Sequence, residues 1–270
     1  MTVYAASARM YAVDARAAEA WTALFGWLGR RSGVALEVAA HAYPKPLSDL
    51  WRRPDLACGF VCGFPFTQSF PDLQPIAAPV PATGPAAGAP RYSTQLVVRA
   101  DAPFGQLEES FGHRLGYTVP DSYSGYVAMR HFLAPYQRAE RDALYAELVG
   151  PLVTPRRVIE AIHSGDIDIG PLDSYALELM LAGDPDLGNR IRVLATTASA
   201  PIPLLAAHAA CPTEVVARLR ETLTADAVDE ERDAILQQLL LKGFVPVSRE
   251  DYAEIVPSDA PPLAPAGSPS

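Results

Sequence analysis

The stretch YSTQLVVRA, residues 92–100, decides how the rest of the chain is interpreted. It is rich in β-branched and apolar residues, which predicts a strand near the middle of the sequence. Apolar runs before it predict further strands at residues 2–13, 34–40, 56–62 and 73–80. Helical spacing of apolar residues predicts helices between them at residues 14–33 and 46–53. Strands that alternate with helices indicate an α/β fold with a largely parallel sheet.

The alternation continues after this central strand. Further strands are predicted at residues 115–119, 144–149, 166–170, 191–196 and 204–207. Further helices are predicted at residues 104–111, 124–136, 155–164, 174–182, 213–224 and 230–241. The last segment, residues 257–270, is rich in proline, alanine and serine. It cannot bury enough apolar surface to order itself, so we expect a flexible tail.

Length and charge limit the classes of function. The 270 residues suit two domains of about 100–150 residues each. A net charge of −9 weighs against nucleic acid and anionic membrane surfaces as partners. No apolar run has the roughly 18 residues that predict insertion into a membrane. An acidic protein still binds a small anion where backbone N–H groups and hydroxyls converge.

The first residues do not resemble an export signal, because Arg9 interrupts the first apolar run. The location stays open: periplasmic if an export signal was removed, cytoplasmic if Met1 is native. The cysteines Cys58, Cys62 and Cys211 show neither a disulfide framework nor the spacing of metal ligands. We expect them to be small buried residues, and we expect no metal or other cofactor.

The segment VPDSYSGYVAMR, residues 119–130, is the first candidate binding site. A strand ends at Pro120 and a helix begins near Ser124 and Gly125, with Ser122 in the turn between them. Exposed N–H groups, the positive end of the helix dipole and serine hydroxyls together form a cradle for an anion. The alternative is that one of these serines is only the N-cap of the helix.

Two further segments place polar groups near strand ends. In GDIDIGPLDSY, residues 165–175, Asp173 lies at the carboxyl end of a buried strand, where ligands bind in open α/β sheets. Asp173 could accept a hydrogen bond from a ligand hydroxyl, amine or phosphonate proton, or it could cap the following helix. At the start of the central strand, Tyr92 precedes the hydroxyl residues Ser93 and Thr94.

In this order, the segments resemble the phosphate/phosphite/phosphonate substrate-binding family of ABC transporters, which has the type II periplasmic-binding-protein fold. The resemblance covers about residues 1–256 and rests on ARMYAV, LWRRPDLACGFVCGFPF, RYSTQLVVRAD, PDSYSGYVAMR, GDIDIGPLDSY and APIPLL. It implies two Rossmann-like lobes joined by two crossover strands, near residues 95–100 and 197–203. One lobe would comprise residues 1–95 and 203–256, and the other residues 96–202.

The resemblance also implies that the ligand lies in the cleft between the lobes and is bound by hydroxyls at a helix start, an acidic residue and aromatic residues. Together with the polar and aromatic residues near strand ends, the candidate ligand-binding residues are Ser122, Tyr123, Ser124, Gly125, Tyr126, Asp173, Tyr92, Ser93, Thr94, Tyr11 and Phe64. Aromatic side chains with a polar tip suit such a pocket.

One stretch departs from the family pattern. Members commonly carry Gly-Ser-His and then a serine ahead of the helix that precedes the Gly-Asp strand. Here the stretch reads GPLVTPRRV, with Leu152 at the position of the histidine and Thr154 or Pro155 near that of the serine. The loss of a histidine and a hydroxyl donor weakens the expectation of a phosphonate-type anion.

We therefore expect a solute-binding protein, not an enzyme, that closes its two lobes around a small anionic ligand such as a phosphonate, phosphite or phosphate. It would serve an ABC uptake system, with an ABC permease as its protein partner. One alternative is a cytoplasmic enzyme on the same fold, similar to chorismate dehydratase or the thiamine-pyrimidine synthases. Of the five histidines, only His41 lies near a predicted strand end, which gives that alternative little support. An orphan ligand sensor is the third hypothesis.

Overall fold

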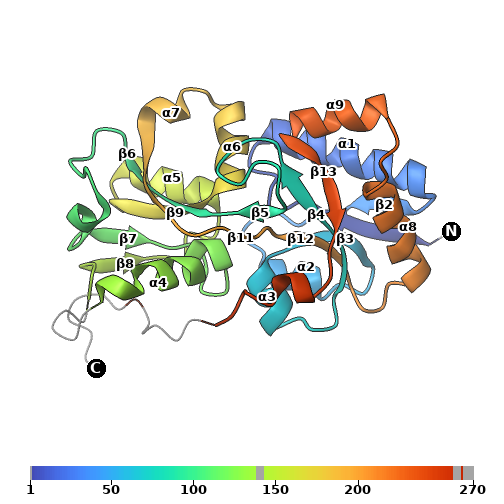
Figure 1. The fold of residues 1–270 in the computed structure, drawn as a ribbon, viewed down its shortest axis with the longest axis horizontal. Coiled ribbons are helices and arrows are strands. Elements are labelled where there is room, and N and C mark those ends of the chain that lie inside the picture. The colour runs from blue at the N-terminus through green and yellow to red at the C-terminus, as the bar shows by residue number, and fades with distance from the viewer. Residues whose placement is uncertain (1, 138–142, 258–262, 264–270) are drawn as a thin grey trace. The chain divides into compact units, whose positions relative to one another are not determined.

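The computed structural model describes residues 2–137, 143–257 and 263 (Figure 1). These residues form two compact units. Unit 1 comprises the described residues up to Arg91 and the segment Ala200–Ile255. Unit 2 comprises Tyr92–Ser199 and the described residues from Val256 onward. The chain therefore passes between the two units three times.

Unit 1 is built on a six-stranded mixed sheet. Its strands are β1 (Val3–Ser7), β2 (Ala35–Val38), β3 (Leu56–Val61), β4 (Gln74–Pro81), β12 (Leu204–Ala207) and β13 (Leu241–Pro246). They follow the order β13-β4-β12-β3-β1-β2. β1 pairs in parallel with β2 and β3, whereas the pairings that involve β12 and β13 are antiparallel. The expectation of a largely parallel sheet is therefore wrong here.

Helices cover both sides of this sheet. They are α1 (Ala15–Ser32), α2 (Leu47–Trp51), α3 (Gly63–Gln68), α8 (Thr213–Leu223) and α9 (Glu230–Gln238), followed by the short 3₁₀ helix η4 (Glu250–Tyr252). Figure 1 shows α1 and α9 on one side of the strands and α2 and α3 on the other. The sheet is thereby the middle layer of a three-layer unit.

Helix α1 shows how the sequence sets the limits of an element. Asp14 is its N-cap, and the side-chain Oδ1 accepts a hydrogen bond from Ala17 N at 2.7 Å. Leu24 and Leu28, one turn apart, are fully buried against the sheet side of the unit. The helix ends at Gly33, whose φ of 67° is the left-handed conformation that glycine adopts without strain.

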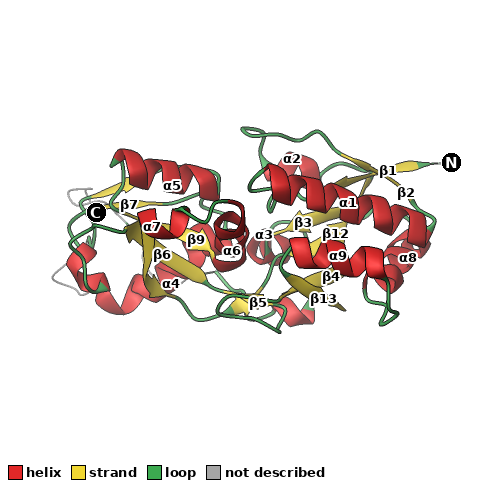
Figure 2. Ribbon diagram, turned by 90° about the horizontal axis from the view of Figure 1, so that it is seen from above, coloured by secondary structure: helices red, strands yellow, loops and turns green. Residues whose placement is uncertain are grey.

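Unit 2 contains a five-stranded mixed sheet and several helices. The strands are β6 (Thr94–Arg99), β7 (Arg114–Gly116), β8 (Glu147–Val149), β9 (Ile169–Asp173) and β10 (Ile191–Thr196). The helical segments are η1 (Leu107–Ser110), η2 (Tyr123–Val127), α4 (Ala128–Leu133), η3 (Ala134–Tyr136), α5 (Pro155–Ser164), α6 (Ser174–Gly183) and α7 (Leu187–Arg190). The strand order is β10-β6-β9-β7-β8. Figure 2 shows α4 and α5 on opposite sides of this sheet.

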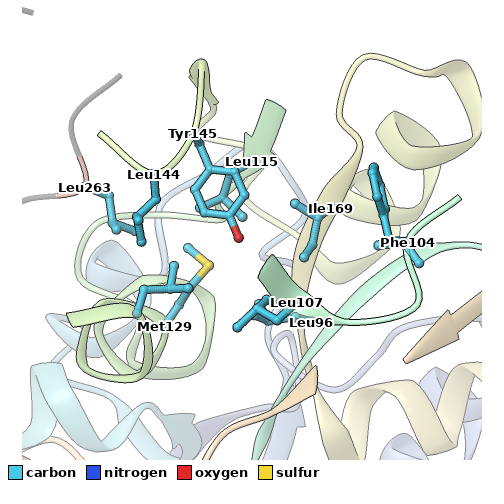
Figure 3. Packing of buried hydrophobic residues seen from close by; sticks show 11 residues of the cluster. Leu96, Phe104, Leu107, Leu115, Met129, Leu144, Tyr145, Ile169 and Leu263 are labelled. Atoms are coloured by element: carbon cyan, nitrogen blue, oxygen red, sulfur yellow. The ribbon is translucent and has the colours of Figure 1, made fainter. Parts of the chain in front are cut away.

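The core of unit 2 is an apolar cluster between its sheet and its helical segments (Figure 3). Leu96 on β6, Ile169 on β9 and Met129 on α4 have no exposed surface. Tyr145 lies in the same cluster, and burial raises the pKa of its hydroxyl to about 12. Strand and helix are thus held together chiefly by apolar contacts, which fix the positions of their ends.

The predicted flexible tail, residues 257–270, lies outside the described residues apart from Pro257 and Leu263. Leu263 is buried in the apolar cluster of unit 2 (Figure 3). Ile255, only eight residues earlier, is buried in unit 1. The contact of Leu263 with unit 2 was not predicted from the sequence.

A short pair of strands lies where the chain leaves and re-enters unit 1. β5 (Arg91–Tyr92) pairs with β11 (Ala200–Pro201). The predicted lobes, residues 1–95 with 203–256 against 96–202, stay a prediction.

Most predicted elements differ in extent from the observed ones, and three of the differences are informative. The helix predicted at 230–241 ends at Gln238, and the strand β13 that follows was missed. Leu240 has a φ of 54°, which ends the helical run despite the apolar sequence. The first strand, predicted to reach residue 13, ends at Ser7 because a turn follows it. The strand predicted at 166–170 extends instead over Ile169–Asp173.

Candidate anion-binding site in unit 2

Two strands of unit 2 bring three predicted site residues together. β6 and β9 are antiparallel, and their register places Thr94 opposite Asp173. Ser93 is held by Ser174 at the start of α6: Ser174 N donates to Ser93 O at 2.9 Å, and Ser93 N donates to Ser174 Oγ at 3.0 Å. These bonds fix Ser93, Thr94 and Asp173 at one end of the two strands.

The helical run that begins with η2 lies beside the same end of β6. Thr94 Oγ1 donates a hydrogen bond to Ser124 O at 2.9 Å. Ser122 is the N-cap, and its Oγ accepts from Gly125 N at 3.0 Å. For Ser122, the contacts therefore match the alternative interpretation, that of a helix cap.

Ser124 is placed differently from Ser122. Its side chain is nearly buried, with 9% exposure, and its hydroxyl has no hydrogen-bond partner among the described residues. It stands in the first helical turn, where backbone N–H groups lack intrahelical acceptors. Ser124 thus offers a hydroxyl donor whose position is set by Thr94 and which no capping bond uses.

Gly125 allows the turn to pack closely against the end of β7. A Cβ at this position would lie 1.7 Å from Thr118 Oγ1 and 3.0 Å from Ser122 Oγ. Thr118 N donates to Gly125 O at 3.2 Å. Thr118 Oγ1 is itself buried and has no hydrogen-bond partner among the described residues. A second hydroxyl, which sequence reasoning missed, therefore packs against the same turn.

Asp173 is buried and caps helix α6. Its Oδ1 accepts from Tyr175 N at 2.8 Å and from Ala176 N at 3.0 Å. For Asp173 too, the alternative interpretation as an N-cap describes these contacts. The two bonds fix the orientation of the carboxylate at the carboxyl end of β9.

Thr197, which follows β10, is a further residue that sequence reasoning missed. Thr94 N donates to Thr197 Oγ1 at 3.0 Å, and Thr197 N donates to Thr94 O at 3.0 Å. Thr197 therefore holds the backbone of Thr94 at the edge of β6 that faces β10, opposite the edge that pairs with β9. An isolated threonine in a connecting segment carries no local sequence signal, so only the fold reveals this role.

The predicted aromatic residues of unit 2 fall into two groups. The rings of Tyr92 and Tyr123 are neighbours, with centroids 6.5 Å apart. Tyr126 instead packs against Tyr117, at 5.4 Å between centroids, and against the apolar core. The guanidinium of Arg130 lies 5.8 Å above the Tyr126 ring. Tyr123 is thus grouped with the strand-end residues, whereas Tyr126 has the contacts of a packing residue.

Two predicted residues belong to unit 1. Tyr11 is fully buried, and its ring meets the Phe60 ring edge-on at 4.9 Å. Phe64 is half-buried in the first turn of α3. Their roles toward a ligand stay predictions.

The stretch that departs from the family pattern lies next to the turn at Gly125. Leu152 N donates to Tyr117 O at 3.0 Å, and Val153 N donates to Thr118 O at 3.1 Å. Leu152 is a buried apolar side chain, and Thr154 is the N-cap of α5. Val153 has a φ of 67°, a left-handed conformation that a β-branched residue adopts only under strain. The substituted positions are therefore close enough to affect binding at this turn.

The described side chains offer no metal centre, and two of the three thiols are held in the protonated form. No group of three histidine, cysteine, aspartate or glutamate residues in the described part of the chain could hold a metal ion. All three cysteines are buried, as the sequence predicted. Burial raises the pKa of Cys211 to about 11 and raises that of Cys58 as well, so both thiols stay protonated at neutral pH. Within the described ranges, no helix is long and apolar enough to cross a bilayer.

Comparison with known protein families matches residues 11–252 to the periplasmic substrate-binding proteins of ABC phosphonate transporters. The chain belongs to this family. Its role is solute binding, and the family consists of transporter binding proteins rather than enzymes. The enzyme alternative is therefore not favoured. No curated protein matches the sequence at a significant level.

Solved structures support the same fold. A binding protein component of an ABC phosphonate transporter from Pseudomonas aeruginosa has a TM-score of 0.79 and 14% identity, over 94% of this chain and 84% of that one. PhnD1 from Prochlorococcus marinus, in complex with methylphosphonate, has a TM-score of 0.77 and 15% identity, over 94% of this chain and 95% of that one. A Xanthomonas citri protein bound to ATP has a TM-score of 0.66 and 20% identity, over 94% and 95%. The type II periplasmic-binding-protein fold predicted from the sequence is confirmed.

Proposed function

We propose that this phosphonate-family member binds a small oxyanion at the first turn of η2, and that it delivers the ligand to an ABC permease. The candidate ligands are a phosphonate, phosphite or phosphate. The observation that carries the proposal is Ser124, a nearly buried serine in a first helical turn whose hydroxyl has no partner among the described residues. Such a donor suits an anion, because it stands in the first turn of a helical run, at the positive end of the helix dipole.

The surrounding residues would divide the work of binding. Ser124 Oγ would donate to an oxygen of the anion, whose negative charge the positive end of the helix dipole would also attract. Thr94 would position Ser124 through the bond to its carbonyl group. Asp173 would accept a hydrogen bond from the P–OH group of a monoprotonated phosphonate or phosphite, because an ionised carboxylate only accepts hydrogen bonds. Tyr92 and Tyr123 would cover the apolar part of the ligand.

The loss of the histidine donor weakens the expectation of a phosphonate-type anion in general, but among such anions the buried Leu152 favours one with few oxygens to satisfy. Leu152 provides an apolar wall beside Thr118, where the family pattern would place a histidine donor. Similar structures hold methylphosphonate, ATP or chloride, so one fold accommodates anions of very different size. We therefore favour methylphosphonate or phosphite over inorganic phosphate, which presents four oxygens.

Calorimetric titration with methylphosphonate, phosphite, phosphate and sulfate tests the proposal. We expect saturable one-site binding of methylphosphonate or phosphite, and a rise in Tm that grows with ligand concentration. Absence of binding by all four anions at millimolar concentration would refute the anion site and leave the fold unaffected. Addition of a permease with bound ATPase, in proteoliposomes, would then test delivery through ligand-dependent ATP hydrolysis.

A further inference from the structure

Unit 1 contains a cavity of about 230 Å³ that the candidate site does not use. Helix α1 contributes Trp21 and Phe25 to its wall, and the segment after β2 contributes Ala39 and His41. Arg9, in the turn after β1, supplies the charged group of this cavity. The volume lies below the range of about 300–1,000 Å³ of pockets for drug-sized ligands, so any occupant is small.

Arg9 differs from other arginines of unit 1. Arg31 pairs with Asp229 at 2.8 Å, and Arg53 pairs with Asp55 at 2.7 Å. The guanidinium of Arg9 has neither a carboxylate nor a carbonyl partner among the described residues, and its Nε is buried without an acceptor. Burial lowers its pKa, and no neighbouring carboxylate counters that effect. A half-buried cation without a counter-charge is an incomplete arrangement that an anion would complete.

The backbone of the turn keeps Arg9 in this place. Arg9 N donates to the buried Ser7 Oγ at 3.2 Å, directly after β1 ends. His41 is fixed on the opposite segment by a bond of 2.8 Å between its Nε2 and Pro46 O, in which the ring nitrogen must be the donor. The charged and polar groups at the cavity therefore stand on anchored segments.

The aromatic wall contains a second donor without an acceptor. Trp21 is 1% exposed, and its indole Nε1 has no hydrogen-bond partner among the described residues. The ring itself is held by an edge-on contact with Phe60 at 5.0 Å. A buried indole N–H is usually satisfied, so this one is a further sign that the region lacks a bound acceptor.

We propose that the Arg9 cavity is a second binding site, for a small organic monocarboxylate with an apolar body. One guanidinium balances one negative charge, and its fork matches a carboxylate in a two-bond arrangement. The mostly apolar wall, with Trp21 and Phe25, would receive the hydrocarbon part of the ligand. The site lies entirely within unit 1 and does not depend on the oxyanion site proposed for unit 2.

Titration of the full chain with benzoate and hexanoate tests this site, with benzamide as the uncharged counterpart of benzoate. We expect the carboxylates to bind with one-to-one stoichiometry and benzamide to bind at least tenfold more weakly. Arg9→Gln should lower the affinity for benzoate at least tenfold and leave the affinity for benzamide unchanged. Ala18→Leu fills the cavity from a partly exposed position of α1. It should therefore lower the affinity for both benzoate and benzamide.

Two control variants separate this site from general effects. Arg218→Gln removes one positive charge from an exposed position of α8 and should leave the affinity for benzoate unchanged. Ser124→Ala should also leave it unchanged, because Ser124 belongs to unit 2. The proposal is overturned if benzoate affinity survives Arg9→Gln in a variant with an unaltered melting curve, or if Ser124→Ala weakens benzoate as much as Arg9→Gln does.

Discussion

Two serines, two positions apart in one turn, are expected to have separate roles. Ser122 Oγ accepts the capping bond from Gly125 N, whereas Ser124 Oγ has no partner among the described residues. Ser122→Ala should therefore lower the free energy of unfolding by about 1 kcal/mol, the usual cost of a lost N-cap. Ser124→Ala should change the free energy of unfolding by no more than about 0.5 kcal/mol. It should lower the affinity for methylphosphonate or phosphite at least tenfold. Urea unfolding and calorimetric titration of both variants would measure this; equal losses of stability would contradict it.

The ion pair between Arg114 and Asp168 predicts a pH effect. Burial raises the pKa of Asp168, but side-chain and backbone hydrogen bonds from Arg114 outweigh it, so the net pKa lies below its ordinary value. A lowered folded-state pKa adds stability above the unfolded pKa of about 3.9, and this stability is lost as the pH falls through the folded pKa.

Asp168→Asn should consequently be less stable than the natural protein at pH 7, and the difference should shrink as the pH falls below about 4. Urea unfolding at several pH values, at fixed ionic strength, would measure the difference. A gap that stays constant across this range would show that the carboxylate charge is not its cause. Asp184→Asn, which alters an exposed ion pair on another segment, is the matched control.

Among single residues, the sequence identified those that stand in a recognisable local context. Ser124 and Asp173 each lie between a predicted strand and a predicted helix, where polar groups either cap or bind. Thr197 was missed because its partner is distant in the chain: Thr197 bonds to Thr94, 103 positions away. Only strand pairing brings such pairs together, and pairing cannot be obtained from local spacing.

Among the elements, η2 depends on a single glycine. The Cβ of an alanine at position 125 would overlap Thr118 Oγ1, at 1.7 Å, so the turn and β7 would have to separate. Gly125→Ala should cost about 1–3 kcal/mol, the range for overpacking a buried site. Thr118→Ala in the same chain should restore part of that loss, because the nearest atom is then absent. Absence of any rescue in urea unfolding would contradict this contact as the cause.

Elements with clear end signals were predicted well, and those without them were not. Helix α5 was predicted at its observed limits, since Pro155 begins it and Gly165, with a φ of 78°, ends it. The strand β13 was missed, because the leucines at 239–241 continue the pattern of the preceding helix up to its first residue. The left-handed φ of Leu240 breaks that pattern, and the residues after it pair with β4.

For the whole molecule, the order of segments was more informative than any local pattern. It identified the two-lobed type II fold, but it did not predict that the sheets are mixed. β12 lies between β3 and β4 and runs antiparallel to both, although more than a hundred residues separate it from them. An insertion of this kind makes the sheet mixed, and alternation of strands and helices along the chain cannot reveal it.

Ligand binding should also affect the protein as a whole. The sequence predicts ligand contacts from Tyr11 and Phe64 in unit 1 as well as from unit 2. If both units bind one anion, the ligand must shift the equilibrium between their open and closed arrangements. Small-angle scattering should then show a smaller radius of gyration at saturating methylphosphonate or phosphite. Ser124→Ala should abolish the change at the same concentration, and unchanged scattering under confirmed saturation would restrict binding to unit 2.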